Sequence, residues 1–193
     1  MSGPLSTHSG GVETLLPDSF RWPGGKKIAV FFRMAFEAWS DDHWPGISPM
    51  GNPLKPGFPD LNARSWAEYG VRRGVFRHHR IKGTMMVSGL LAERYPHIVK
   101  QIADEGHEVC AHSYTMNMMS IYMNEKEERA NIRRDVQLIT KATGKRPVGW
   151  SNPRGTPSPN TARLLAEEGF EHHGDVLNDD LPYVVDFGKS SIV

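Results

Sequence analysis

Short apolar runs alternate along this 193-residue chain with longer segments in which apolar residues recur at helical spacing. The apolar runs cover residues 27–32, 82–87, 109–112, 148–150 and about 170–173. Between and after them, helices are predicted over residues 65–79, 96–106, 124–143 and 158–169. Strands that alternate with helices favour a parallel sheet, because a parallel neighbour is reached through a crossover connection. The pattern therefore predicts an α/β protein built on a parallel sheet or barrel.

The remaining segments set the expected limits of the domain. Residues 1–15 are expected to form a flexible N-terminal tail, and residues 16–193 a single domain, which suits the length of the chain. Residues 40–62, rich in Pro and Gly, are expected to form a long loop. Residues 190–193 resemble the start of a strand without a sequel, so the domain is expected to be incomplete at its C-terminus, with an exposed sheet edge. A homo-oligomer or another chain would then complete the sheet.

Composition argues against several classes of function. The formal net charge is +1, which gives no reason to expect a nucleic-acid partner. No run of about 18 apolar residues is present, so no membrane span is expected. The N-terminal residues lack the charged and then apolar pattern of a signal peptide, so a cytoplasmic protein is expected. The single cysteine, Cys110, lies in an apolar run and is interpreted as a buried thiol rather than a nucleophile, since no activating base is evident beside it.

Three polar side chains come just after three of the predicted strands, namely Glu37, His112 and Arg154. The C-terminal ends of parallel strands face one mouth of a barrel, where catalytic groups are found. A carboxylate and an imidazole suit Zn²⁺ or a similar divalent ion, which would activate a water for attack on an amide carbonyl. An arginine could orient a carboxylate or stabilise an oxyanion. The structural alternatives are an exposed acid at Glu37, a hydrogen-bonded histidine at His112 and an exposed loop residue at Arg154.

The other histidines and the methionines are interpreted as structural. His107 follows the helix-ending Gly106 and is expected to cap that helix or to lie at the opposite end of its strand. The histidine pairs at 78–79 and 172–173 resemble ligand clusters, but neighbouring residues of a strand or helix point apart. Of these, His173 is the better functional candidate, because it lies near a strand end. The methionines between residues 116 and 123 are expected in the core or in the lining of a pocket.

Residues 106–115 resemble the second motif of the polysaccharide deacetylase superfamily, the NodB-homology domain. In that motif a histidine, then Ser or Thr, then a second histidine four positions on bind the metal. Residues 27–39 resemble the first motif, a strand that carries acidic residues, and residues 146–154 resemble the third. Blocks at 22–24, 68–75, 149–150, 160–161, 167–170 and 179–183 are most similar to the allantoinase-like and cyclic-imidase-like branch.

The resemblance implies a distorted (β/α) barrel with fewer than eight strands, here lacking its C-terminal strands. It implies hydrolysis of a non-peptide carbon–nitrogen bond in a small cyclic amide, imide or ureide. The late histidine of the superfamily, a general acid, falls beyond Val193. Two alternatives stay open. One is deacetylation of an N-acetylated sugar or polysaccharide, and the other is an inactive or truncated homologue that binds a small molecule or a partner chain without turnover.

The resemblance also implies the site residues. Glu37 and His112 would be both metal ligands and catalytic groups, with Arg154 as the third catalytic residue. Ala35 stands where the family pattern has the aspartate base, and Met116 where it has the second histidine ligand. A thioether is a poor ligand for such an ion, so the implied site, with Zn²⁺ preferred, is one ligand short of the usual three. The expected substrate-binding residues are Trp39, Tyr114, Trp150, Asp179 and Asp180, the last two with loop capping as the alternative.

Overall fold

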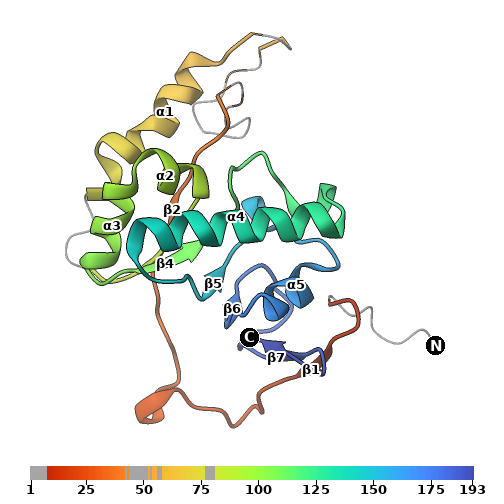
Figure 1. Ribbon diagram of the computed structural model, residues 1–193. Helices are drawn as coiled ribbons and strands as arrows, with labels where there is room; N and C mark the ends of the chain where they lie inside the picture. The colour runs from red at the N-terminus through yellow and green to blue at the C-terminus, as the bar shows by residue number, and fades with distance from the viewer. Residues whose placement is uncertain (1–7, 42, 44–51, 53, 56–57, 77–80) are drawn as a thin grey trace.

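The computed structural model describes residues 8–41, 43, 52, 54–55, 58–76 and 81–193 (Figure 1). Its centre is a five-stranded parallel sheet in the order β2-β3-β4-β5-β6. The strands are β2 (Arg33–Phe36), β3 (Thr84–Val87), β4 (Glu108–Ala111), β5 (Gly149–Trp150) and β6 (His172–His173). The predicted α/β fold with a parallel sheet is confirmed. Within the described residues the sheet does not close, which agrees with a distorted and incomplete barrel.

The helices lie between the strands in sequence. They are α1 (Leu61–Arg72), α2 (Gly89–Arg94), α3 (Pro96–Asp104), α4 (Glu125–Thr143) and α5 (Thr161–Glu167). Short 3₁₀ turns occur at η1 (Pro23–Gly25), η2 (Gly74–Phe76), η3 (Ser120–Tyr122) and η4 (Pro153–Gly155). Helices α2, α3 and α4 pack on one another, and α3 and α4 pack on β4. In the described part of the chain, every helix is too short or too polar to cross a bilayer.

Local signals set both ends of α4 as predicted, but not the start of α5. The Asn124 side chain caps the start of α4, and Gly144 ends it in the left-handed conformation with φ of 76°. Helix α5 begins at Thr161 rather than at Ser158. The Ser158 hydroxyl instead accepts a hydrogen bond from the Asn160 NH at 3.1 Å, which forms a turn ahead of the helix.

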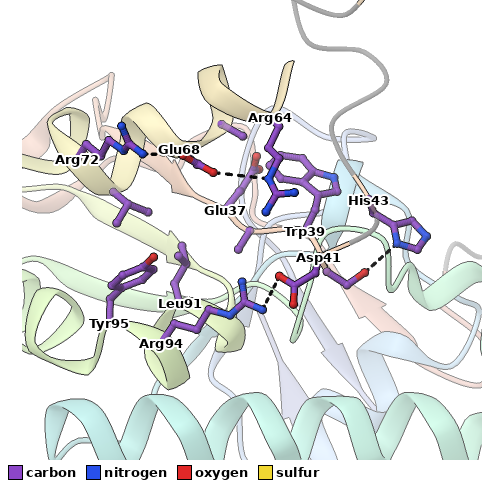
Figure 2. Close-up of a pocket in the computed structure, with 14 residues that line it drawn as sticks. Glu37, Trp39, Asp41, His43, Arg64, Glu68, Arg72, Leu91, Arg94 and Tyr95 are labelled. Atoms are coloured by element: carbon purple, nitrogen blue, oxygen red, sulfur yellow. Dashed lines mark hydrogen bonds and ion pairs between the residues drawn. The ribbon is translucent and has the colours of Figure 1, made fainter. Parts of the chain in front are cut away.

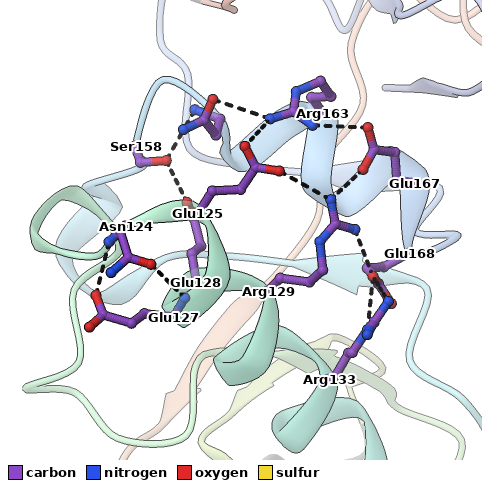
Figure 3. A network of polar contacts seen from close by, with 11 residues as sticks. Asn124, Glu125, Glu127, Glu128, Arg129, Arg133, Ser158, Arg163, Glu167 and Glu168 are labelled. Carbon is purple, nitrogen blue, oxygen red and sulfur yellow. Dashed lines mark hydrogen bonds and ion pairs between the residues drawn. The ribbon is translucent and has the colours of Figure 1, made fainter.

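Arginines of α4 tie this helix to α5 (Figure 3). The Arg129 guanidinium lies 2.5 Å from a Glu167 carboxylate oxygen and 2.9 Å from a Glu168 oxygen. Arg163 of α5 reaches back to Glu125 of α4 at 2.8 Å. Because several charges share partners, the network holds α5 against α4 more firmly than an isolated surface pair would.

The apolar run at residues 27–32 was expected to be a buried strand, and this prediction is wrong. Strand β2 begins after the run, and Ile28, Val30 and Phe31 are exposed. Only the end of the run joins the sheet, where Phe32 O accepts from the Thr84 NH at 2.8 Å. A strand needs a neighbour that satisfies its backbone groups, and no described strand pairs with residues 28–31.

Helix α1 begins earlier than the predicted helix at 65–79. Asp60, rather than Ser65, is the capping residue, because Asp60 Oδ1 accepts from the Ala63 NH at 2.9 Å. The helix ends at Arg72. The end of the predicted helix, with the histidine pair at 78–79, lies outside the described residues, as does much of the loop predicted at 40–62.

The two ends of the described chain meet in a small antiparallel sheet. Its strands are β1 (Val12–Thr14), β7 (Val184–Asp186) and β8 (Ser191–Ile192), in the order β1-β7-β8. Part of the segment expected to be a flexible tail is therefore a strand, and residues 1–7 lie outside the described residues. After β8, Val193 O accepts from the His173 NH at 2.9 Å, and the Val193 NH donates to Glu171 O at 3.0 Å. The small sheet thereby meets the main sheet at β6.

Candidate functional site

The candidate site lies at the C-terminal edge of the main sheet. Four buried side chains, one from each of β2 to β5, stand in register across the sheet, namely Phe36, Val87, Ala111 and Trp150. The residues that follow them are Glu37, Ser88, His112 and Ser151. Successive residues of a strand point to opposite faces, so this second row faces away from the core row. Glu37 and His112, which directly follow β2 and β4, therefore lie together at the C-terminal edge of the sheet, as the sequence predicted.

Glu37 and His112 are in contact. Glu37 Oε1 lies 3.2 Å from His112 Nε2, and His112 Nδ1 lies 2.6 Å from Ser151 O. A carbonyl oxygen only accepts, so Nδ1 carries a proton and Nε2 is the nitrogen that faces the carboxylate. His112 is 3% exposed, whereas 28% of the Glu37 side chain is accessible. The carboxylate is therefore the member of the pair that a ligand can reach.

A buried carboxylate fixes the end of β5 beneath this pair. Asp175 accepts from the Ser151 hydroxyl at 3.1 Å and from the Asn152 NH at 2.8 Å, and its second oxygen accepts from Asn152 Nδ2 at 2.7 Å. Burial alone would raise the pKa of Asp175, but the nearby His173 imidazole, 3.6 Å away, and hydrogen bonds from Asn152 outweigh it and hold the pKa below its usual range. The ionised carboxylate therefore holds the Ser151 carbonyl that orients His112.

Glu37 opens into a cavity of about 300 Å³ between α1 and α2 (Figure 2). Its lining combines aromatic and apolar side chains, among them Trp39, Leu91 and Tyr95, with arginines from both helices. Arg94 pairs with Asp41 at 2.7 Å, and Arg64 and Arg72 both pair with Glu68, at 3.6 and 3.0 Å. Of the predicted substrate-binding residues, Trp39 lies in this cavity.

Two other predicted substrate-binding residues make contacts elsewhere. The Tyr114 hydroxyl donates to Glu93 at 2.7 Å, and the Arg134 guanidinium lies 3.4 Å from the centre of the Tyr114 ring. Trp150 is fully buried in the core, with its ring edge-on to Phe170 at 5.8 Å. Neither side chain lines the cavity beside Glu37.

The remaining predicted site residues lie apart from the Glu37–His112 pair. Arg154 follows β5 at the same edge of the sheet, exposed and with a φ of 58°, and within the described residues it has no hydrogen bond to Glu37 or His112. Asp179 and Asp180 line a second cavity, of about 760 Å³, between the two sheets. Asp179 Oδ1 accepts from the Leu181 NH at 2.9 Å, which is the loop-capping role given as the alternative.

The donor set does not match a three-ligand metal site. Among the residues that the structure describes, no group of three or more His, Cys, Asp or Glu side chains is placed to hold an ion. Glu37 and His112 supply two donors. Met116 lies in the loop that follows β4 and contains His112. Its NH donates to Ala38 O at 2.9 Å, and its side chain is buried. Position 116 is thus next to the pair, but it carries a thioether, which binds Zn²⁺ poorly.

Polar residues that the sequence did not indicate hold this site together. Asp135 and Asn131 of α4 bond to the chain around His112, and Asp175 bonds to the end of β5. Asn131 and Asp135 are spaced by one helical turn beside the apolar Ile132 and Val136. A polar pair at that spacing within an apolar stripe was the available signal.

The architecture is that of the NodB-type (β/α) barrel proteins. The chain superimposes on a probable polysaccharide deacetylase from Pseudomonas aeruginosa PAO1 with a TM-score of 0.73 and 30% identity, over 89% of this chain and 62% of that one. The structure of Puue allantoinase gives a TM-score of 0.73 and 30% identity, over 89% of this chain and 63% of that one.

The sequence model of the polysaccharide deacetylase family matches residues 73–173, and the chain belongs to this family. A peptidoglycan deacetylase of Helicobacter pylori is 35% identical over 126 residues, which are 64% of this chain and 43% of that protein. The chain spans less than two thirds of the length of each of these relatives. The resemblance inferred from the motifs is confirmed at the level of the family and the fold.

Proposed function

We propose that this protein hydrolyses a non-peptide carbon–nitrogen bond in a small cyclic amide, imide or ureide. The observation that carries the proposal is the contact between Glu37 Oε1 and His112 Nε2, at the strand ends and beside a cavity. A carboxylate and an imidazole in contact form an acid–base pair, which is what addition of water to an amide requires.

Glu37 carries the proton transfers, and His112 holds it in place. The Glu37 carboxylate takes a proton from water as the water oxygen bonds to the carbonyl carbon. As the carbon–nitrogen bond breaks, Glu37 passes this proton to the leaving nitrogen, which restores the carboxylate. His112 Nε2, 3.2 Å from Oε1, orients the carboxylate toward the cavity. The hydrogen bond from Nδ1 to the Ser151 carbonyl keeps Nε2 as the nitrogen that faces Glu37.

The cavity supports a small substrate. Its volume of about 300 Å³ suits a ring-sized molecule, and Trp39 and Tyr95 offer flat aromatic surfaces to it. The guanidinium groups of Arg64 and Arg94 are donors for carbonyl or carboxylate oxygens. Arg154, at the same edge of the sheet, is a further group that would orient the substrate. The 30% identity to Puue allantoinase supports a ureide.

A deacetylase of an N-acetylated sugar is the second candidate. It is supported by the 35% identity to a peptidoglycan deacetylase, and the same acid–base pair would cleave an acetamide. The sequence-predicted Zn²⁺ would find only Glu37 and His112 as donors in the described residues, so no step is assigned to a metal. Ala35 and Met116, at the two departures from the family pattern, motivate the third candidate, a homologue that binds without turnover.

Hydrolysis assays on allantoin, succinimide and N-acetylglucosamine oligomers separate these candidates. We expect ring opening of allantoin or succinimide, and loss of that activity by at least about 100-fold in Glu37→Gln and in His112→Gln. Asp104→Asn and His97→Gln, at exposed positions of α3, are the matched controls and are expected to keep it. Release of acetate from the oligomers alone would favour the deacetylase. Binding without hydrolysis of any substrate would favour the third candidate.

A further inference from the structure

Two polar side chains of helix α4 form hydrogen bonds to His112 and to the two residues that follow it. Asp135 of α4 is fully buried, and its Oδ2 accepts from the His112 NH at 2.9 Å. One helical turn earlier, Asn131 Oδ1 accepts from the Tyr114 NH at 3.1 Å, and Asn131 Nδ2 donates to the Ser113 hydroxyl at 2.9 Å. From these contacts we propose that Asp135 is a positioning residue, which holds the His112 main chain so that the imidazole faces Glu37.

The chain needs such support at this point. Ser113 has a φ of 66°, in the left-handed region that residues other than glycine rarely adopt. A conformation of this kind persists only where surrounding contacts impose it. Because Ser113 directly follows His112, relaxation of this turn would rotate the imidazole away from both Glu37 Oε1 and Ser151 O.

The position of the Asp135 carboxylate is itself tightly defined. A Cβ atom added at Gly89 would come within 2.4 Å of Asp135 Oδ1, so the carboxylate fills the space that a side chain at this residue would take. The Gly89 NH donates to Ser113 O at 3.0 Å. The start of α2, the turn after β4 and the middle of α4 therefore meet at one carboxylate.

A role in packing alone would not call for this residue type. Burying a carboxylate costs free energy that an apolar side chain does not, and the neighbouring Ile132 and Val136 pack in the core. Burial raises the pKa of Asp135 to about 8, although the hydrogen bond from the His112 NH acts in the opposite direction. An acidic residue at position 135 is explained by the main-chain donor that it holds in place, the His112 NH.

The inference rests on the proposed function only for the chemical role of His112. It is tested by NMR of protein with ¹⁵N-labelled histidine, in which couplings between ring nitrogens and ring carbon-bound protons report which nitrogen carries the proton. The variant is Asp135→Asn and the matched control is Glu128→Gln. Glu128 is a second fully buried carboxylate, about two turns earlier on the same face of α4, and it accepts from the Ser158 and Thr161 hydroxyls.

In Asp135→Asn we expect the His112 ring signals to shift or split. On the substrate that the wild type hydrolyses, kcat should fall by about 10- to 100-fold while KM stays within about twofold. In Glu128→Gln we expect a lower Tm with unchanged His112 signals. Unchanged His112 signals in Asp135→Asn, or equal changes in both variants, would overturn the proposal.

Two further outcomes are also decisive. If Asp135→Asn does not fold, Gly89→Ala replaces it, because the added Cβ would displace the same carboxylate, and the same shift of the His112 signals is expected. If the wild type hydrolyses none of the substrates, the proposed function fails, while the NMR comparison still decides whether Asp135 sets the state of the His112 ring.

Discussion

Glu37 Oε1 lies 3.2 Å from His112 Nε2, although the strands that carry these residues are separated by β3. Two strand spacings correspond to roughly 9 to 10 Å between the main chains of β2 and β4. The contact is made because the β3 residue in the same row is the small Ser88, so the two longer side chains meet above it. This one contact joins the first and second family-like motifs into a site.

The pair should behave as a unit in a double-mutant cycle. We expect Glu37→Gln and His112→Gln each to lower kcat by at least about 100-fold, and the double variant to be no more than about tenfold below the worse single variant. The measurement is steady-state kinetics on the ring substrate, with circular dichroism to check folding. Losses that multiply in the double variant would mean that the two groups act independently.

Restoring the missing histidine should create a metal site. The Met116 NH bonds to Ala38 O, beside Glu37, so an imidazole at position 116 starts from main chain adjacent to the pair. After dialysis we expect less than about 0.1 equivalent of zinc in the wild type and about one equivalent in Met116→His, because a third ligand completes the usual set. Elemental analysis is the measurement. Met123→His is the control, and equal zinc in the two variants would contradict the expectation.

Glu108, the first residue of β4, should stabilise the folded protein only at pH values at which its carboxyl group is ionised. A hydrogen bond from His172 Nε2, at 2.8 Å, lowers the pKa of Glu108, and a bond from the Thr84 hydroxyl adds to this. Since the folded-state pKa lies below the unfolded value of about 4.5, the contribution is present above that pH and is lost as pH falls through the folded-state pKa.

We therefore expect Tm to fall less between pH 6 and pH 3 in Glu108→Gln than in the wild type, where those pH values bracket the usual carboxyl range of about 4. Thermal unfolding followed by circular dichroism checks this. Asp104→Asn, at an exposed carboxylate on α3, should keep the wild-type dependence. A Glu108→Gln variant that loses as much Tm as the wild type would show that this carboxylate is not responsible.

Cys110 should be inert in the folded protein. Burial, with a smaller effect of Glu108, raises the pKa of this thiol to about 12, and the side chain is fully buried. We expect native protein at pH 8 to react with a thiol reagent at least about 100-fold more slowly than denatured protein, because the thiolate is the reactive form. The chain has one cysteine, so denatured protein should react with one equivalent of the thiol reagent. Rapid labelling of native protein would contradict the buried position of β4.

Local sequence signals predicted the elements whose ends are made by their own residues. Pro96 and Gly106 bracket α3, and Asn124 and Gly144 bracket α4, because caps act within one turn of the helix. The strand expected at residues 27–32 failed for the opposite reason. Its apolar residues satisfy the pattern of a buried strand, but a strand also needs a partner, and the partner is supplied by distant parts of the chain.

The sequence by itself determined the fold class, the family resemblance and the two residues that meet at the strand ends, since all three depend on residue order and spacing. Tertiary structure decided the rest. Packing against β4 and α2 buries Asp135 of α4 and makes its carboxylate the acceptor for the His112 NH. It also separates Tyr114, Trp150 and Asp179 from the cavity beside Glu37. Burial and hydrogen-bond partners depend on which distant segments lie together, and that information is not present in local sequence pattern.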